Sequence, residues 1–194
     1  MCKLLIVFVL FLFAIQCGGT GPSKEETARV LAHTYVLATP ISSPEALFDY
    51  VQENREYFVK NGPAIRLARA LGNRLIREGV GAYDPNAFER AMGVGPAEFA
   101  PDVARSLNEG AYQALAMGQE LCWLADVLPA VAVGDYGPYQ TTGTLARQAV
   151  RQSLPYIYGM MEMLDPEIAQ LYEETMNLYM PLAEDYIFML AMMF

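Results

Sequence analysis

The side chains that enzymes use for nucleophilic and metal chemistry are scarce in this chain. His33 is the only histidine, so a Ser-His-Asp triad would have to form around it, and the sequence has no Gly-x-Ser-x-Gly turn. The Glu-x-x-His pairs of di-iron bundles, a His and Cys zinc set and a phosphate-binding glycine loop are also missing. We therefore expect His33 to be a packed or surface histidine. We assign no catalytic residue, no metal site and no cofactor.

Carboxylates offer the remaining route to catalysis. Glu109, Glu120, Asp126 and Glu162 fall on predicted long helices, where two of them facing a cleft would form a general acid and base. Solvated or helix-capping carboxylates are the commoner arrangement, so we predict a non-catalytic domain.

Methionines gather late in the chain, and thioethers are ligands for Cu(I). The spacings Met160-x-x-Met163 and Met176/Met180 place each pair on one helix face. Because no histidine lies near them, we favour core filling by these flexible apolar side chains over copper binding.

Two stripes on predicted helices define a possible ligand groove. Ser106, Gly110, Ala114, Gly118 and Cys122 recur every fourth residue in one helix. Such small side chains either admit another helix closely or leave a groove. In the last helix Tyr172, Tyr179 and Tyr186 recur every seventh residue and share one stripe, suited to a core rim or an apolar binding wall.

An arginine-rich face is predicted on the third helix. Arg66, Arg69, Arg74 and Arg77 lie on one side and apolar residues such as Leu71 on the other. We call these four residues the arginine face. It is either a solvated or internally paired face, or a dock for an anionic surface such as lipid headgroups or an acidic partner.

Helix-start and helix-stop residues predict the elements that must position these groups. Serine caps, prolines at first helical positions and glycines after last turns mark the boundaries. The predicted helices cover 23–39, 43–61, 63–78, 84–93, 101–128, 144–164 and 165–194, with a loop over 129–143.

No stretch alternates apolar and polar residues long enough to form a sheet. We therefore predict an all-α fold, a single bundle of about seven helices over residues 23–194 with the long fifth, sixth and seventh helices at its centre. The two stripes then place a groove between the fifth and seventh helices.

The first seventeen residues end at a cysteine that could carry a lipid. Leu4 to Ile15 is an uninterrupted apolar run of twelve residues. It makes about 18 Å of helix, which is short for a membrane span and typical of a secretory signal. Cys17 follows directly, before a Gly-Gly linker. Cys122, within an apolar run, is expected to be a buried and inert thiol.

Residues 1–22 resemble the N-terminus of bacterial lipoproteins, in which the cysteine after the apolar run is acylated and becomes the new N-terminus. The resemblance implies a signal peptide over 1–16, a lipidated Cys17 and a linker to residue 22. Gln16 departs from the small residue that the family has before the cut. An ordinary secretory signal cut near Gly19, or an uncleaved anchor, is the alternative. Gly18 after the cysteine favours the outer membrane over inner-membrane retention.

Charge narrows the class of partner. The net charge is −9, and it becomes −10 when Lys3 leaves with the signal, which argues against nucleic acid. We predict a lipid-anchored cell-envelope protein, facing the periplasm, whose helical domain binds an envelope partner without catalysis. The alternatives are a carrier of a small apolar or lipid-like ligand and a secreted or periplasmic soluble protein.

Overall fold

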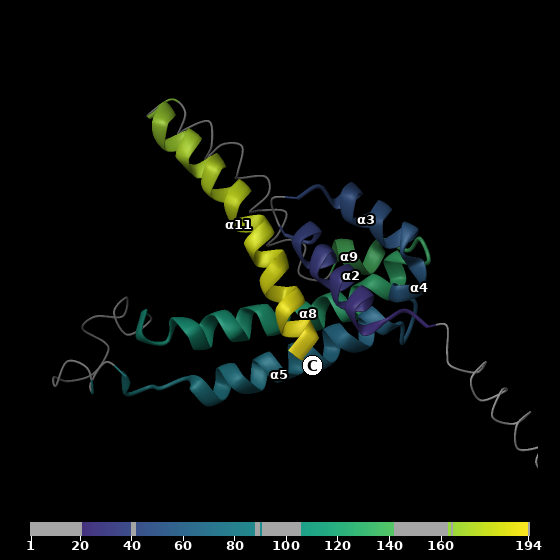
Figure 1. Cartoon of the computed structure of the whole chain (residues 1–194), viewed down its shortest axis with the longest axis horizontal. Coiled ribbons are helices and arrows are strands. Elements are labelled where there is room, and N and C mark those ends of the chain that lie inside the picture. Colours follow the sequence, from purple (N-terminus) through teal and green to yellow (C-terminus); the bar gives the residue numbers. More distant parts are fainter. Residues whose placement is uncertain are drawn as a thin grey trace, which may run out of the picture.

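The computed structural model describes residues 21–39, 42–87, 90, 106–141, 163 and 165–193, and it is helical throughout its regular elements (Figure 1). The described part contains no strand, which confirms the predicted all-α fold. The predicted signal peptide, Cys17 and the expected helix over 144–164 lie outside the described residues. The elements are α2 (Lys24–Leu37), α3 (Pro44–Glu53), α4 (Arg55–Phe58), α5 (Pro63–Ala82), α8 (Glu109–Val131), α9 (Gly137–Thr141) and α11 (Pro166–Met193).

Capping side chains set the helix starts, as the sequence predicts. The Ser23 hydroxyl accepts a hydrogen bond from the Glu26 N–H at 3.1 Å, and the Glu26 carboxylate accepts one from the Ser23 N–H at 3.4 Å. This capping box satisfies two N–H groups, one of them an amide that the helix itself leaves unpaired. Prolines occupy first helical positions in α3, α5 and α11, where their missing N–H costs nothing.

The prediction of one continuous helix over 43–61 is wrong. Asn54, at φ −109° and ψ 33°, divides it into α3 and α4. The Tyr50 carbonyl accepts both the Asn54 backbone N–H at 3.0 Å and the Asn54 side-chain amide at 2.9 Å, so Asn54 closes the last turn of α3 with two hydrogen bonds. The predicted loop over 129–143 also contains a short helix, α9, whose Tyr139 is buried against Trp123 and Phe48.

α8 continues through Pro129, where the sequence predicts its end. A proline lacks the N–H that would bond to the carbonyl four residues earlier, here that of Ala125. The Arg69 guanidinium of α5 approaches this carbonyl at 3.5 Å and also pairs with the Asp126 carboxylate at 2.7 Å. A side chain from a neighbouring helix therefore supplies the donor that Pro129 removes, and α8 reaches Val131.

Glycines bring α5 and α8 into close antiparallel contact, the most extensive contact between helices in the described structure. A Cβ atom at Gly72 would lie 2.8 Å from the Gly118 carbonyl oxygen, and one at Gly118 would lie 2.7 Å from the Gly72 carbonyl oxygen. Further along α5, a Cβ at Gly79 would lie 2.8 Å from the Ala111 carbonyl oxygen. These distances leave no room for a side chain at the three positions. The sequence predicts the end of this helix at Gly79, but α5 continues to Ala82, and Gly79 serves the packing against α8.

Within the described residues the core lies mainly between α2, α5 and α8. Leu31, Leu71 and Leu121, one from each of the three helices, are completely buried. α3, α4 and α9 close one end of this core, seen at the right of Figure 1. Of the helices predicted for the centre, α8 lies in this core and α11 contributes the buried Ala191, while the sixth lies outside the described residues. The sequence analysis did not place α2 and α5 there because it relied on helix length, whereas the glycine contacts pair α8 with α5.

α11 lies antiparallel to α2 and extends beyond it. Three contacts join the helices, each from a residue of α2 to a residue of α11. The Lys24 ammonium donates to the Met192 carbonyl at 2.8 Å, and the Arg29 guanidinium lies 4.7 Å from the centre of the Phe188 ring. The His33 Nδ1 atom lies 3.2 Å from a carboxylate oxygen of Glu184. α11 has 28 residues and α2 has 14. The N-terminal half of α11 therefore projects past the end of α2 (Figure 1).

Candidate functional site

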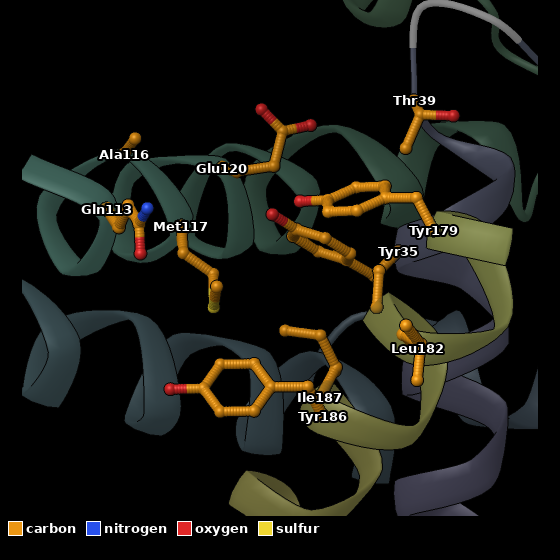
Figure 2. A pocket seen from close by; sticks show the side chains of 11 residues that line it. Tyr35, Thr39, Gln113, Ala116, Met117, Glu120, Tyr179, Leu182, Tyr186 and Ile187 are labelled. Atoms are coloured by element: carbon orange, nitrogen blue, oxygen red, sulfur yellow. The ribbon is translucent and has the colours of Figure 1, made fainter. Parts of the chain in front are cut away.

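A groove of about 610 Å³ lies between α8, the C-terminal half of α11 and the end of α2 (Figure 2). It lies between the same two long helices that the sequence singles out. Its lining residues are Tyr35, Thr39, Gln113, Ala116, Met117, Glu120, Tyr179, Leu182, Ala183, Tyr186 and Ile187.

Each helix contributes one face to the groove. On α8 and on α11 the lining residues follow the i, i+3, i+4, i+7 spacing of a single helical surface, beginning at Gln113 and Tyr179. Tyr35 comes from α2, and Thr39 lies just past the end of that helix. α8 is held by α5 on one side through Gly118, and α11 is held by α2. Ala116 and Ala183 each present only a methyl group to the space between them, so the helices leave it open.

The groove has an apolar part and a polar part. Met117, Leu182 and Ile187 supply aliphatic walls, and Ile187 is completely buried. Tyr35, Tyr179 and Glu120 all line the groove, and in the view of Figure 2 the hydroxyl groups of both tyrosines point toward the same region of the groove as Glu120. Hydroxyl groups both donate and accept hydrogen bonds, and a carboxylate accepts them. The arrangement suits a ligand with an apolar body and a polar end.

The described wall of the groove carries negative charge. Glu120 is a carboxylate, and among the described residues that line the groove none is Lys, Arg or His. Over residues 166–193 the sequence of α11 has five Asp or Glu residues and no Lys, Arg or His. A cleft with one sign of charge concentrates ligands of the opposite sign and repels those of the same sign.

The structure brings some of the predicted groove residues together. Tyr179 and Tyr186 line the groove. Gly118 instead faces α5, and Gly110 is exposed, where an added Cβ would have no atom within 4 Å. Ala114 is not among the described lining residues, and the Tyr172 side chain lies outside the described part.

Four residues on α8 line the groove without having been predicted to do so, although Glu120 was considered as an acid or base. Gln113, Ala116, Met117 and Glu120 mix polar, small and apolar types, so composition does not mark their face as distinct. Their i, i+3, i+4, i+7 spacing is a signal in principle, but every helix face has it. Only the position of α11 selects this one.

All four side chains of the arginine face are exposed and have partners within the chain. Arg69 pairs with Asp126 of α8, and Arg74 pairs with Glu78 one turn along α5. Arg66 and Arg77 donate to the backbone carbonyls of Asn61 and Asn73, at 2.6 and 3.3 Å. Exposed ion pairs of this kind contribute about 0–1 kcal/mol, so they do not prevent exchange for another anion. Docking of this face on an anionic surface stays a prediction.

The other candidate groups are separated in the structure. Glu109 accepts a hydrogen bond from the Gln113 amide at 3.1 Å, Asp126 binds Arg69, and Glu162 lies outside the described residues. Cys122, predicted to be buried, is partly exposed, and its sulfur lies against α5 at 3.8 Å from the Asn73 amide oxygen. Its partial burial raises the pKa of the thiol. Within the described ranges, no three His, Cys, Asp or Glu side chains converge as a metal site would require.

An apolar stripe on α11 remains exposed. Residues at successive spacings of seven, four, seven and four have between 50% and 67% of their surface accessible. This spacing places them along one side of the helix. We call them the α11 stripe: Leu171, Leu178, Leu182, Met189 and Met193. The stripe was not predicted, because the regular tyrosine spacing on the adjoining face is the more conspicuous pattern in the sequence.

α8 is long and apolar enough to cross a membrane by length and composition alone. A core helix passes the same test, and α8 packs on α5, so the observation is weak evidence for a span. In comparisons with known proteins, no protein-family model matches the chain, and no curated protein or solved structure is significantly similar to it.

Proposed function

We propose that the domain binds a small apolar or lipid-like ligand, without transforming it, in the groove between α8, α11 and α2. The observation that carries this proposal is the groove itself. Its volume of about 610 Å³ falls within the range of about 300–1,000 Å³ of ligand sites, and its walls combine aliphatic and aromatic side chains with a few polar groups.

We further propose that the domain works at a membrane surface, tethered through a lipid on Cys17. The support is the lipoprotein-like sequence of residues 1–22 and the start of α2 at Lys24. The short linker between Cys17 and the Ser23 cap spans at most about 20 Å when fully extended. A domain held this close to a bilayer would reach lipid-like molecules directly.

The proposal is tested by filling the groove. Ala116→Trp adds a large ring to the groove wall, and Ala70→Trp makes the same exchange at an exposed position on α5 outside it. The probe is N-phenyl-1-naphthylamine, an apolar dye that fluoresces when shielded from water, added to residues 17–194 carrying Cys17→Ser. We expect Ala116→Trp to weaken dye binding by at least about tenfold, equivalent to about 1.4 kcal/mol, and Ala70→Trp to leave it unchanged. Equal binding by both variants would refute the groove as the site.

A protein-interaction function is the second candidate, and the α11 stripe favours it. Exposed apolar surface of this extent on one helix is a feature of interaction sites. Changing Leu171 and Leu178 to Gln together should reduce the size of any complex that the chain forms in envelope extracts, as seen on native gels. An unchanged complex would rule out the stripe as its contact.

A further inference from the structure

We propose that the ligand of the groove is a cationic amphiphile, an alkyl chain that ends in an amine, and that Glu120 binds the amine. This inference rests on the proposed function, because it names the class of ligand for the same groove. It follows from the charge, the aromatic rings and the division of the groove into two parts.

The polar part of the groove has a negatively charged side chain, which attracts a cation and repels an anion. An ammonium group has three donors and no acceptor, and the Glu120 carboxylate accepts through two oxygens. A carboxylate can accept several hydrogen bonds at once, so its contacts within the protein do not exclude a ligand amine. A fatty acid would instead bring a second carboxylate to Glu120, and none of the described lining residues is a base that could pair with it.

The tyrosine rings add a second attraction. Tyr35 and Tyr179 line the same groove as Glu120 (Figure 2), and the face of an aromatic ring attracts a cation placed over it. A carboxylate beside aromatic rings thus recognises an amine by two independent effects, neither of which helps an anion.

The apolar part accommodates the chain of the same ligand. Met117 and Leu182 line it, and the buried Ile187 contributes to its wall. An amphiphile can therefore place its alkyl chain against these side chains while its amine remains at Glu120. The negative charge of the whole protein, −9, would raise the local concentration of such a cation at low salt.

The test compares three head groups on one chain. Photoreactive decylamine, decanol and decanoate, each with the same diazirine, are cross-linked to the full chain in phosphatidylcholine nanodiscs, and the labelled peptides are identified by mass spectrometry. We expect labelling of the groove-lining peptides of α8 and α11 in the order amine, alcohol, carboxylate. This comparison uses the unmodified chain and needs no variant. If the carboxylate probe labelled the groove best, the inference would be overturned.

Two matched variants then assign the preference to Glu120. Glu120→Gln and Glu78→Gln remove one negative charge each, but Glu78 lies on α5 and pairs with Arg74 outside the groove. The ratio of amine to alcohol labelling should fall about tenfold in Glu120→Gln, as loss of a charge-assisted hydrogen bond would produce, and should hold in Glu78→Gln. Groove labelling with the same ratio in both variants would overturn the inference and leave the proposed function standing. Labelling of no groove peptide by any probe would overturn the proposed function itself.

Discussion

The contact between α5 and α8 yields the sharpest stability prediction, through Gly118→Ala. The new Cβ would lie 2.7 Å from the Gly72 carbonyl oxygen and 2.9 Å from the Ile76 nitrogen, where ordinary contacts begin at 3.4 Å. Both atoms belong to the backbone, so no side-chain rotation relieves the overlap. α5 would have to retreat by about 0.7 Å along the contact with Gly72, which disturbs the buried leucines on both helices.

The expected magnitude combines two opposing effects. Overpacking costs about 1–3 kcal/mol, and an overlap with backbone lies at the upper end of that range. Replacing a helical glycine by alanine stabilises the folded helix by about 1 kcal/mol, because alanine has the higher helix propensity. We therefore expect Gly118→Ala to lower the free energy of unfolding by about 2 kcal/mol, which corresponds to a fall in Tm of roughly 4–8 °C for a domain of this size.

Gly110→Ala is the matched control, since Gly110 lies on the same helix with nothing within 4 Å of its Cβ position. It should be neutral or stabilise the protein by up to about 1 kcal/mol. The assay is urea denaturation followed by circular dichroism, with thermal melts in parallel. If the two variants were equally stable, or Gly118→Ala were the more stable, the close helix contact would be refuted.

Three further predictions follow from other parts of the chain. The intact mass of the membrane-extracted protein should match residues 17–194 plus lipid, and a soluble product with another N-terminus, or unchanged partitioning of Cys17→Ser, would contradict the proposed anchor. Changing all four residues of the arginine face to Gln should abolish a weak, salt-sensitive attachment to anionic vesicles, whereas equal binding by both forms would leave this face without a docking role. Burial, followed by a hydrogen bond to Glu26, raises the pKa of Tyr57 to about 12, so the stability that it contributes should be present below pH 10 and lost between about pH 10 and 12. Alkaline unfolding profiles that coincide for the unmodified chain and Tyr57→Phe would contradict this.

Local chemistry explains why the helix starts could be predicted. A serine cap or a first-turn proline acts on its own neighbours, so Ser23 and Pro63 mark their helices without knowledge of the rest of the fold. Helix ends were less predictable because other helices decide them. α5 continues past Gly79, where the absence of a side chain allows α8 to pack closely. α8 continues past Pro129, where the Arg69 guanidinium approaches the Ala125 carbonyl that the proline leaves without its N–H donor.

The groove was predictable on one side only. The seven-residue spacing of Tyr179 and Tyr186 placed both on one stripe of α11, and both line the groove. On α8 the four-residue spacing of small residues drew attention to Gly110 and Gly118. The closer signal was a spacing of seven, Gly72 with Gly79 on α5 and Ala111 with Gly118 on α8, which marks the two helices as partners. Because α5 packs on the face of α8 that carries Gly118, the groove is lined by a neighbouring face of α8.

The central claim is that the groove holds an apolar ligand, and native mass spectrometry of the protein purified from its own host tests it most directly. The unmodified chain should carry a small molecule that is lost on activation, and Ala116→Trp, expressed in the same host, should be free of it. A bare unmodified chain, or the same ligand retained by Ala116→Trp, would contradict the claim.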